Sequence, residues 1–205
     1  MSGHLKDPRV GHDVLLGCVI AVGMAVLEVL YNLLPPLAGR PPAVPTFHAA
    51  VAALTGSAAL STMIFDQSIG GIFVGMFAVL GYVLLRLTLR RTSFAVAGVV
   101  VLLAIVQAQQ VLTSTAPMWM AVLFQLAIIA IITTVIVRYG LLVTAIASAV
   151  GNVLGSIPLT LSLSHWTAPT SNLTIAALLA LTLFGFYASR AGQPLFGDFG
   201  ADRKP

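Results

Sequence analysis

The sequence predicts an all-α fold, a polytopic bundle of helices that crosses a membrane. Six long apolar runs occupy most of the 205 residues, and a helix needs about 20 such residues to cross a bilayer. Apolar residues make up 59% of the chain and charged residues 8%, and the mean hydropathy is +1.02. Too little polar surface remains to cover a water-soluble globule.

The first predicted span covers residues 14–34, and Pro35 and Pro36 are expected to end it because proline lacks the N–H that a helix needs. Residues 47–65 are long enough to span but are rich in Ala, Ser, Thr and Gly. We interpret them as a re-entrant or interfacial helix, and a seventh span is the alternative. Asp66 is predicted to cap the next span, 69–85.

Four further spans are predicted at 94–112, 118–137, 141–157 and 173–188. Pro117 precedes the second of these, Arg138 separates it from the third, and Arg190 follows the last. Residues 14–190 therefore form the predicted transmembrane domain, between a cytoplasmic N-terminal segment, 1–13, and a cytoplasmic tail, 191–205.

The basic residues predict the orientation, because short cytoplasmic loops are enriched in Lys and Arg. Six spans with both termini inside leave only Arg40 outside, whereas seven spans with the N-terminus outside place eight basic residues inside and two outside. We favour six spans. The nine residues then inside are Lys6, Arg9, Arg86, Arg90, Arg91, Arg138, Arg190, Arg203 and Lys204.

The net charge of +4 does not indicate nucleic-acid binding, because the basic residues stand singly or in small groups beside apolar runs and are suited to anionic lipid. The bilayer is therefore the first expected partner. The single cysteine, Cys18, excludes an internal disulfide.

Glu28 is the one carboxylate deep in a predicted span, where a charge costs at least a few kcal/mol. Asn32 lies one turn later on the same helix face, so the two are candidates for an intramembrane polar site that binds an ion or a headgroup. The alternative is structural: Glu28 reaches the interface or hydrogen-bonds a neighbouring helix.

Two Gly-x-x-x-Gly motifs lie within predicted spans, and glycines at this spacing let two helix backbones approach closely. We favour packing inside the bundle, and a homo-oligomer or a protein partner is the alternative. Outside the spans, His165 and Trp166 are candidates for contact with a partner on an outer loop. The motifs consist of Gly71 with Gly75, and Gly151 with Gly155.

Catalytic and metal motifs are absent from the sequence, so no cofactor and no metal site are predicted. The four histidines lack the spacing of a zinc site. Asp198-Phe199-Gly200 matches the magnesium-binding triplet of protein kinases, but no glycine-rich loop or His-Arg-Asp accompanies it.

Several segments together resemble the C-terminal membrane region of a group of largely acidobacterial serine/threonine kinases and related membrane proteins. The resemblance covers nearly the whole chain, although His12 and Ser162 stand where Arg and Asp are more usual. Its segments are residues 7–17, 138–142, 158–161 with Trp166, 185–189 and 192–197.

The resemblance implies a bacterial cytoplasmic membrane, an N-terminus inside and no catalytic residue in this chain. Three functions are then open. The first is a non-catalytic membrane module that anchors, senses or assembles with a partner, and it is the one the sequence favours. The second is a small transporter or channel subunit that uses Glu28, and the third is a truncated membrane-bound kinase.

Overall fold

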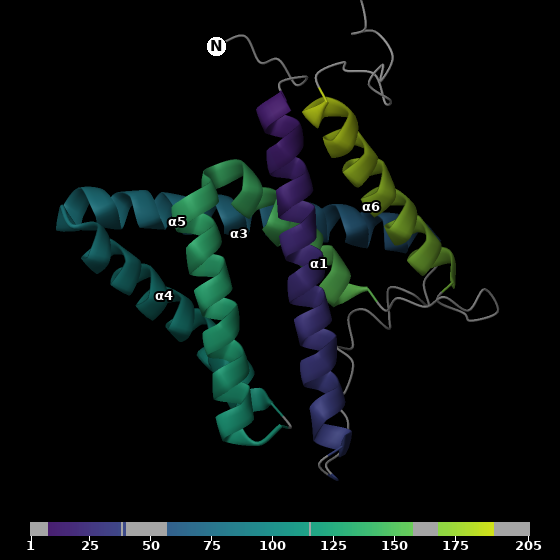
Figure 1. Ribbon diagram of the computed structural model, residues 1–205. Helices are drawn as coiled ribbons and strands as arrows, with labels where there is room; N and C mark the ends of the chain where they lie inside the picture. The colour runs from purple at the N-terminus through teal and green to yellow at the C-terminus, as the bar shows by residue number, and fades with distance from the viewer. Residues whose placement is uncertain (1–7, 38, 40–56, 115, 158–167, 191–205) are drawn as a thin grey trace, which may run out of the picture.

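The computed structural model describes residues 8–37, 39, 57–114, 116–157 and 168–190, and Figure 1 shows that its regular structure there is entirely helical. The predicted all-α class is confirmed. In chain order the helices are α1 (Pro8–Leu37), α3 (Ser57–Leu89), α4 (Thr92–Thr113), α5 (Met118–Ser156) and α6 (Ala168–Ser189).

Five helices in the described part of the chain are long and apolar enough to cross a membrane. The predicted spans 118–137 and 141–157 both lie within α5, so six separate spanning helices are not observed. Gly140 interrupts α5 with φ 77° and ψ −158°, a backbone conformation that essentially only glycine adopts. Figure 1 shows α5 turning sharply and continuing in another direction.

The outer surface of the helices is apolar, as expected for helices in lipid. Leu112 is 78% exposed, Leu87 71% and Phe77 68%. A water-soluble monomer rarely exposes large contiguous apolar patches, whereas the same side chains face hydrocarbon at no cost in a bilayer. The exposed surface therefore supports the membrane location that the composition predicts.

Two local predictions near α3 are wrong. Residues 57–65 do not form a helix separate from the next span, because α3 runs without interruption from Ser57 to Leu89. Asp66 therefore lies inside a helix and is not an N-cap. The polar Ser68 is accommodated there, since its Oγ donates to the Ile64 carbonyl at 2.7 Å. Residues 47–56 lie outside the described residues.

The end of α1 is close to its predicted position. The helix includes Pro35 and Pro36 in its last turn and ends at Leu37, so the two prolines stand where the helix stops. The Pro36 carbonyl accepts a hydrogen bond from the Gly39 N–H at 3.1 Å, in a turn where Gly39 has a φ of 72°.

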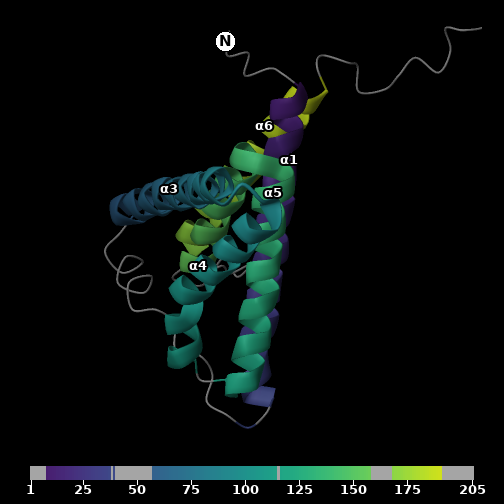
Figure 2. The same ribbon diagram turned by 90° about the vertical axis from the view of Figure 1, so that its left-hand side faces the viewer.

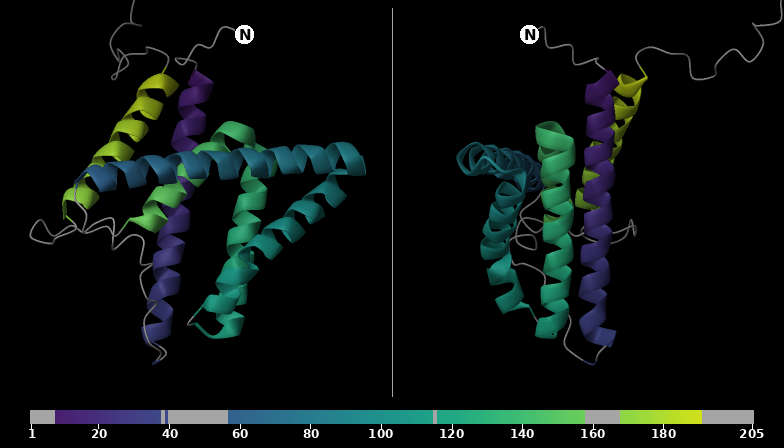
Figure 3. Two further views of the ribbon diagram at one scale, coloured as in Figure 1. Left: turned by 180° about the vertical axis from the view of Figure 1, so that it is seen from behind. Right: turned by 60° about the vertical axis from the view of Figure 1, so that its left-hand side comes forward.

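Helix α5 is central to the arrangement. In the right-hand view of Figure 3 its first half lies between α4 and α1, and its bend brings the second half back against α1. Gly17 of α1 meets Ile146 of that second half, where an added Cβ would lie 2.8 Å from the Ile146 Cγ2. Val14, Cys18, Ala21 and Val150 form the buried cluster at this contact.

Helix α6 lies along the N-terminal half of α1, and Figures 1 and 2 show the start of α1 beside the end of α6. Two glycines allow this approach. A Cβ at Gly11 would lie 2.6 Å from the Gly185 carbonyl oxygen, and a Cβ at Gly185 would lie 3.1 Å from side-chain atoms of Val14 and Leu15.

Helix α3 runs transverse to α1 in Figures 1 and 3 and crosses the second half of α5. The crossing is made by small residues on both helices. A Cβ added to Gly71 would lie 2.5 Å from the Cα of Ala149, and one added to Gly75 would lie 2.8 Å from the Cα of Ala145. The two backbones therefore touch, with no side chain between them.

Candidate functional site

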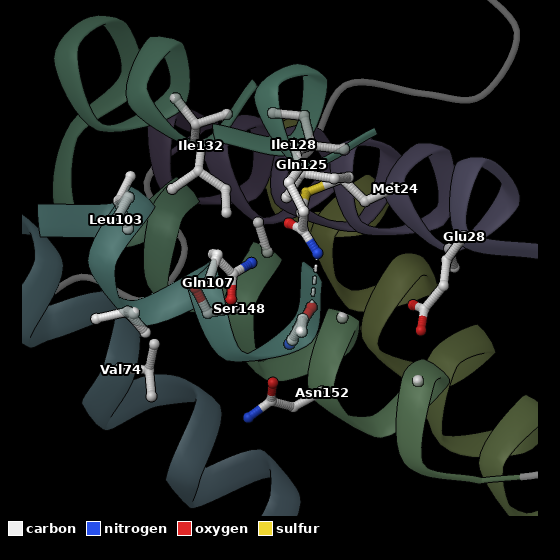
Figure 4. A pocket seen from close by; sticks show the side chains of 18 of the residues that line it. Met24, Glu28, Val74, Leu103, Gln107, Gln125, Ile128, Ile132, Ser148 and Asn152 are labelled. Atoms are coloured by element: carbon white, nitrogen blue, oxygen red, sulfur yellow. Dashed lines mark hydrogen bonds between the residues drawn. The ribbon is translucent and has the colours of Figure 1, made fainter. Parts of the chain in front are cut away.

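A cavity of about 420 Å³ lies between four helices and is the candidate site (Figure 4). This volume is within the range of about 300–1,000 Å³ that small-molecule sites occupy. Helices α1, α3, α4 and both halves of α5 contribute to its lining. The polar lining residues are Glu28, Gln107, Gln110, Gln125, Thr144, Ser148, Asn152 and Ser156.

The second half of α5 presents a polar stripe to the cavity. Thr144, Ser148, Asn152 and Ser156 recur every four residues, and all four line the cavity. Residues at this spacing share one helix face. Thr144 Oγ1 donates to the Gly140 carbonyl at 2.7 Å, so its hydrogen is already used. Ser148 and Asn152 remain as the central polar groups of this wall in Figure 4.

Three glutamines form the wall opposite this stripe. Gln107 and Gln110 come from α4 and Gln125 from the first half of α5. Gln125 is only 8% exposed, and its Nε2 donates to Gln110 Oε1 at 2.9 Å. Its own Oε1 has no hydrogen-bond partner in the described part of the chain. A buried amide oxygen without a partner costs about 1–3 kcal/mol.

Glu28 lies at one end of the cavity. It follows Ile20 and Met24 at four-residue spacing on the face of α1 that lines the cavity, and in Figure 4 its carboxylate points toward the second half of α5. Gly155 lies close to it, since a Cβ at that position would be in ordinary van der Waals contact with Glu28 Oε2, at 3.5 Å. The surrounding residues leave the Glu28 side chain exposed.

The opposite end of the cavity is apolar. In Figure 4, Val74, Leu103 and Ile132 lie on the side away from Glu28, with the amides of Gln107, Gln125 and Asn152 between the two ends. These apolar side chains come from α3, α4 and α5. The cavity thus changes along its length from a carboxylate through amides and hydroxyls to a hydrocarbon wall.

An aromatic contact joins three helices beside the Glu28 end. Tyr31 lies one turn after Glu28 on α1, and its ring stacks on the Phe124 ring with centroids 4.2 Å apart. The Tyr31 hydroxyl also lies 2.5 Å from Ser114 Oγ at the end of α4. Phe124 lines the cavity, so this contact fixes the positions of α1, α4 and α5 next to the carboxylate.

The residues predicted from sequence are only partly brought together. Glu28 joins the cavity, but Asn32 is exposed and is not part of the lining. Gly151 and Gly155 line the cavity, and no atom of the described residues would lie within 4 Å of a Cβ added to Gly151. His165 and Trp166 lie outside the described residues. Within the described ranges, no group of three His, Cys, Asp or Glu residues is placed to hold a metal ion.

The wall formed by Gln107, Gln110 and Gln125 is the feature of the site that was not predicted from the sequence. A polar end of the predicted span 94–112 is visible in the sequence, and so is the four-residue repeat from Thr144 to Ser156. Their convergence with Gln125 and Glu28 depends on the bend of α5 at Gly140. A repeat of polar residues every four positions in a spanning helix is the pattern that would have indicated the site.

Comparison with known proteins gives no relative from which a role could be inferred. No protein-family model matches the chain, and no curated protein or solved structure is significantly similar to it.

Proposed function

We propose that this chain is an integral membrane protein that binds a small amphipathic solute in the cavity and carries it across the membrane, as a transporter or channel subunit. The observation that supports this function is the polar lining of an open cavity that lies between helices whose outer surfaces are apolar. No catalytic step is assigned to the chain.

Polar side chains within a membrane are expensive and normally face a partner or a water-filled cavity. One amide hydrogen bond, between Gln125 and Gln110, satisfies part of this lining. Packing alone would require far fewer polar groups than the carboxylate, four amides and three hydroxyls that line the space. A bound solute gives these groups the hydrogen bonds that the protein leaves open.

We propose six crossings with both termini on the cytoplasmic side. The start of α1 and the end of α6 lie side by side in Figures 1 and 2, which supports an even number of crossings. The basic residues at the helix ends support the cytoplasmic assignment of the two termini.

Uptake into proteoliposomes tests solute transport. The probes are radiolabelled phenyltrimethylammonium, phenylalanine and benzenesulfonate, which are similar in size and carry a positive charge, both charges and a negative charge. We expect the wild-type protein to take up at least one of them faster than protein-free liposomes do.

A pair of asparagine variants links uptake to the cavity. Asn152→Phe places a ring in the lining and is expected to abolish the uptake, because the ring occupies the space of the solute. Asn172→Phe makes the same change at an exposed position of α6 and should leave uptake unchanged. Folded wild-type protein that takes up none of the three probes, or equal uptake by both variants, would contradict transport through this cavity.

A further inference from the structure

We infer that the solute is an organic cation with an apolar body, whose charged group pairs with Glu28 while its body lies among Val74, Leu103 and Ile132. This inference rests on the proposed function and specifies the class of solute.

The charge of the cavity lining gives the first reason. Glu28 is the single ionisable side chain among the described residues that line the cavity, and no Lys, Arg or His accompanies it there. The ion pair between His12 and Asp13 lies near the start of α1, and neither residue lines the cavity. A carboxylate without a counter-charge is costly at membrane depth, and a bound cation offsets that cost.

The amide groups in the middle of the cavity also suit a positive charge. Gln107, Gln110, Gln125 and Asn152 each contribute an amide oxygen, and none of the described residues donates a hydrogen bond to the Gln125 Oε1. Carbonyl oxygens stabilise a cation through their dipoles. An anion would instead meet the Glu28 carboxylate with no basic side chain to offset the repulsion.

The ring of Phe124 gives a further reason. It lines the cavity and is stacked on Tyr31, one turn along α1 from Glu28. A carboxylate combined with an aromatic ring is the combination that recognises ammonium groups, through charge pairing and the negative face of the ring.

The shape of the cavity argues for an organic cation over a bare metal ion. Its volume of about 420 Å³ is much larger than an ion requires, and no second carboxylate among the described residues lines it. The apolar end opposite Glu28 would be left facing water by an inorganic ion (Figure 4). An aromatic or alkyl body fills that end and gains from its removal from water.

The test compares the same three probes in uptake and binding, using the full chain in liposomes. We expect phenyltrimethylammonium to be preferred over phenylalanine and benzenesulfonate by at least about tenfold. The Glu28 carboxylate attracts its ammonium group, whereas it repels the carboxylate of phenylalanine and the sulfonate of benzenesulfonate. Glu28→Gln keeps the shape of the side chain and should weaken phenyltrimethylammonium binding by about tenfold or more.

Asp66→Asn is the matched control, because it also removes one carboxylate from a helix but lies outside the cavity lining. It should leave the affinity for phenyltrimethylammonium unchanged. Leu103→Ser should weaken binding without reversing the preference for the cation, since it alters the apolar end alone.

The outcomes separate the two proposals. Uptake of phenylalanine or benzenesulfonate in preference to the cation would overturn the inference and leave solute transport intact. Binding of the cation that is equal in wild type, Glu28→Gln and Asp66→Asn would also overturn it. Absence of uptake of all three probes by folded protein would instead contradict the proposed function.

Discussion

The crossing of α3 and α5 makes a sharp prediction about two adjacent glycines. Gly70 and Gly71 follow each other in α3. An added Cβ at Gly70 would have no atom of the described residues within 4 Å, whereas at Gly71 it would lie 2.5 Å from Ala149 Cα and 2.6 Å from the Ser148 carbonyl oxygen. The same substitution, Gly→Ala, is therefore expected to have opposite effects at the two positions.

The magnitude follows from these distances. Carbon atoms in contact prefer a separation of about 3.5–4.0 Å, so the helices must separate by roughly 1 Å to accept a methyl group at Gly71. The obstructing atoms belong to the α5 backbone and cannot rotate away. Overpacking of this kind costs about 1–3 kcal/mol, whereas Gly70→Ala gains up to about 1 kcal/mol in helix propensity.

The assay uses the chain's own cysteine. Cys18 is the single cysteine in the sequence and is 5% exposed in the cluster between α1 and α5, so a maleimide fluorophore reacts with it when the protein unfolds. Thermal melting followed in this way should give a midpoint for Gly71→Ala that is lower than that of the wild type by roughly 2–10 °C. Gly70→Ala should melt at the wild-type temperature or slightly above it. Equal midpoints for the two variants would refute the close backbone contact.

Two further predictions concern the bend of α5 at Gly140 and the hydrogen bond between Gln110 and Gln125. Gly140→Ala should destabilise the protein by about 1–3 kcal/mol, because φ 77° with ψ −158° is unfavourable for any residue with a Cβ. Melting midpoints measure this loss, and Gly151→Ala is the helical control, since an added Cβ there would have no atom of the described residues within 4 Å. Gln110→Leu and Gln125→Leu each break the 2.9 Å hydrogen bond between the two side chains. The stability loss of the double variant should therefore be smaller than the sum of the two single losses, and the difference should be about 0.5–1.5 kcal/mol. Strict additivity in a double-mutant cycle would show that the two amides do not interact.

The sequence predicts the class of the fold well because lipid imposes length and composition directly on each helix. To within one residue, the six apolar runs fall within the five described helices that are long and apolar enough to span. Pro35 and Pro36 lie within two residues of the end of α1. Composition is a local property, and it is visible without knowledge of packing.

The predictions that failed depend on how neighbouring segments join. Asp66 was predicted to cap a helix because it interrupts an apolar run, but α3 accommodates it as an exposed side chain. Gly140 lies between two predicted spans, and its positive φ places a kink between the two helical halves of α5. Neither outcome follows from local polarity.

The site is predicted least well because it is assembled from distant parts of the chain. Glu28 could be identified alone, since it is a carboxylate within an apolar run. Asn32 was expected beside it from helical spacing, but Asn152 and Gln125 occupy the cavity instead. Those partners are brought to Glu28 by the bend at Gly140 and the crossing at Gly71, which are tertiary features.

The central claim is that a cation enters a water-accessible cavity beside Glu28, and cysteine modification tests it most directly. In a Cys18→Ala background, Asn152→Cys places a thiol in the cavity lining, and the protein in liposomes is treated with a positively charged methanethiosulfonate reagent. Leu179→Cys serves as the lipid-facing control, because Leu179 is 57% exposed on the outside of α6. We predict rapid modification at position 152, slowed severalfold by phenyltrimethylammonium, and little modification at position 179. A rate at position 152 that matches the lipid-facing control, or that is unchanged by the cation, would contradict the claim.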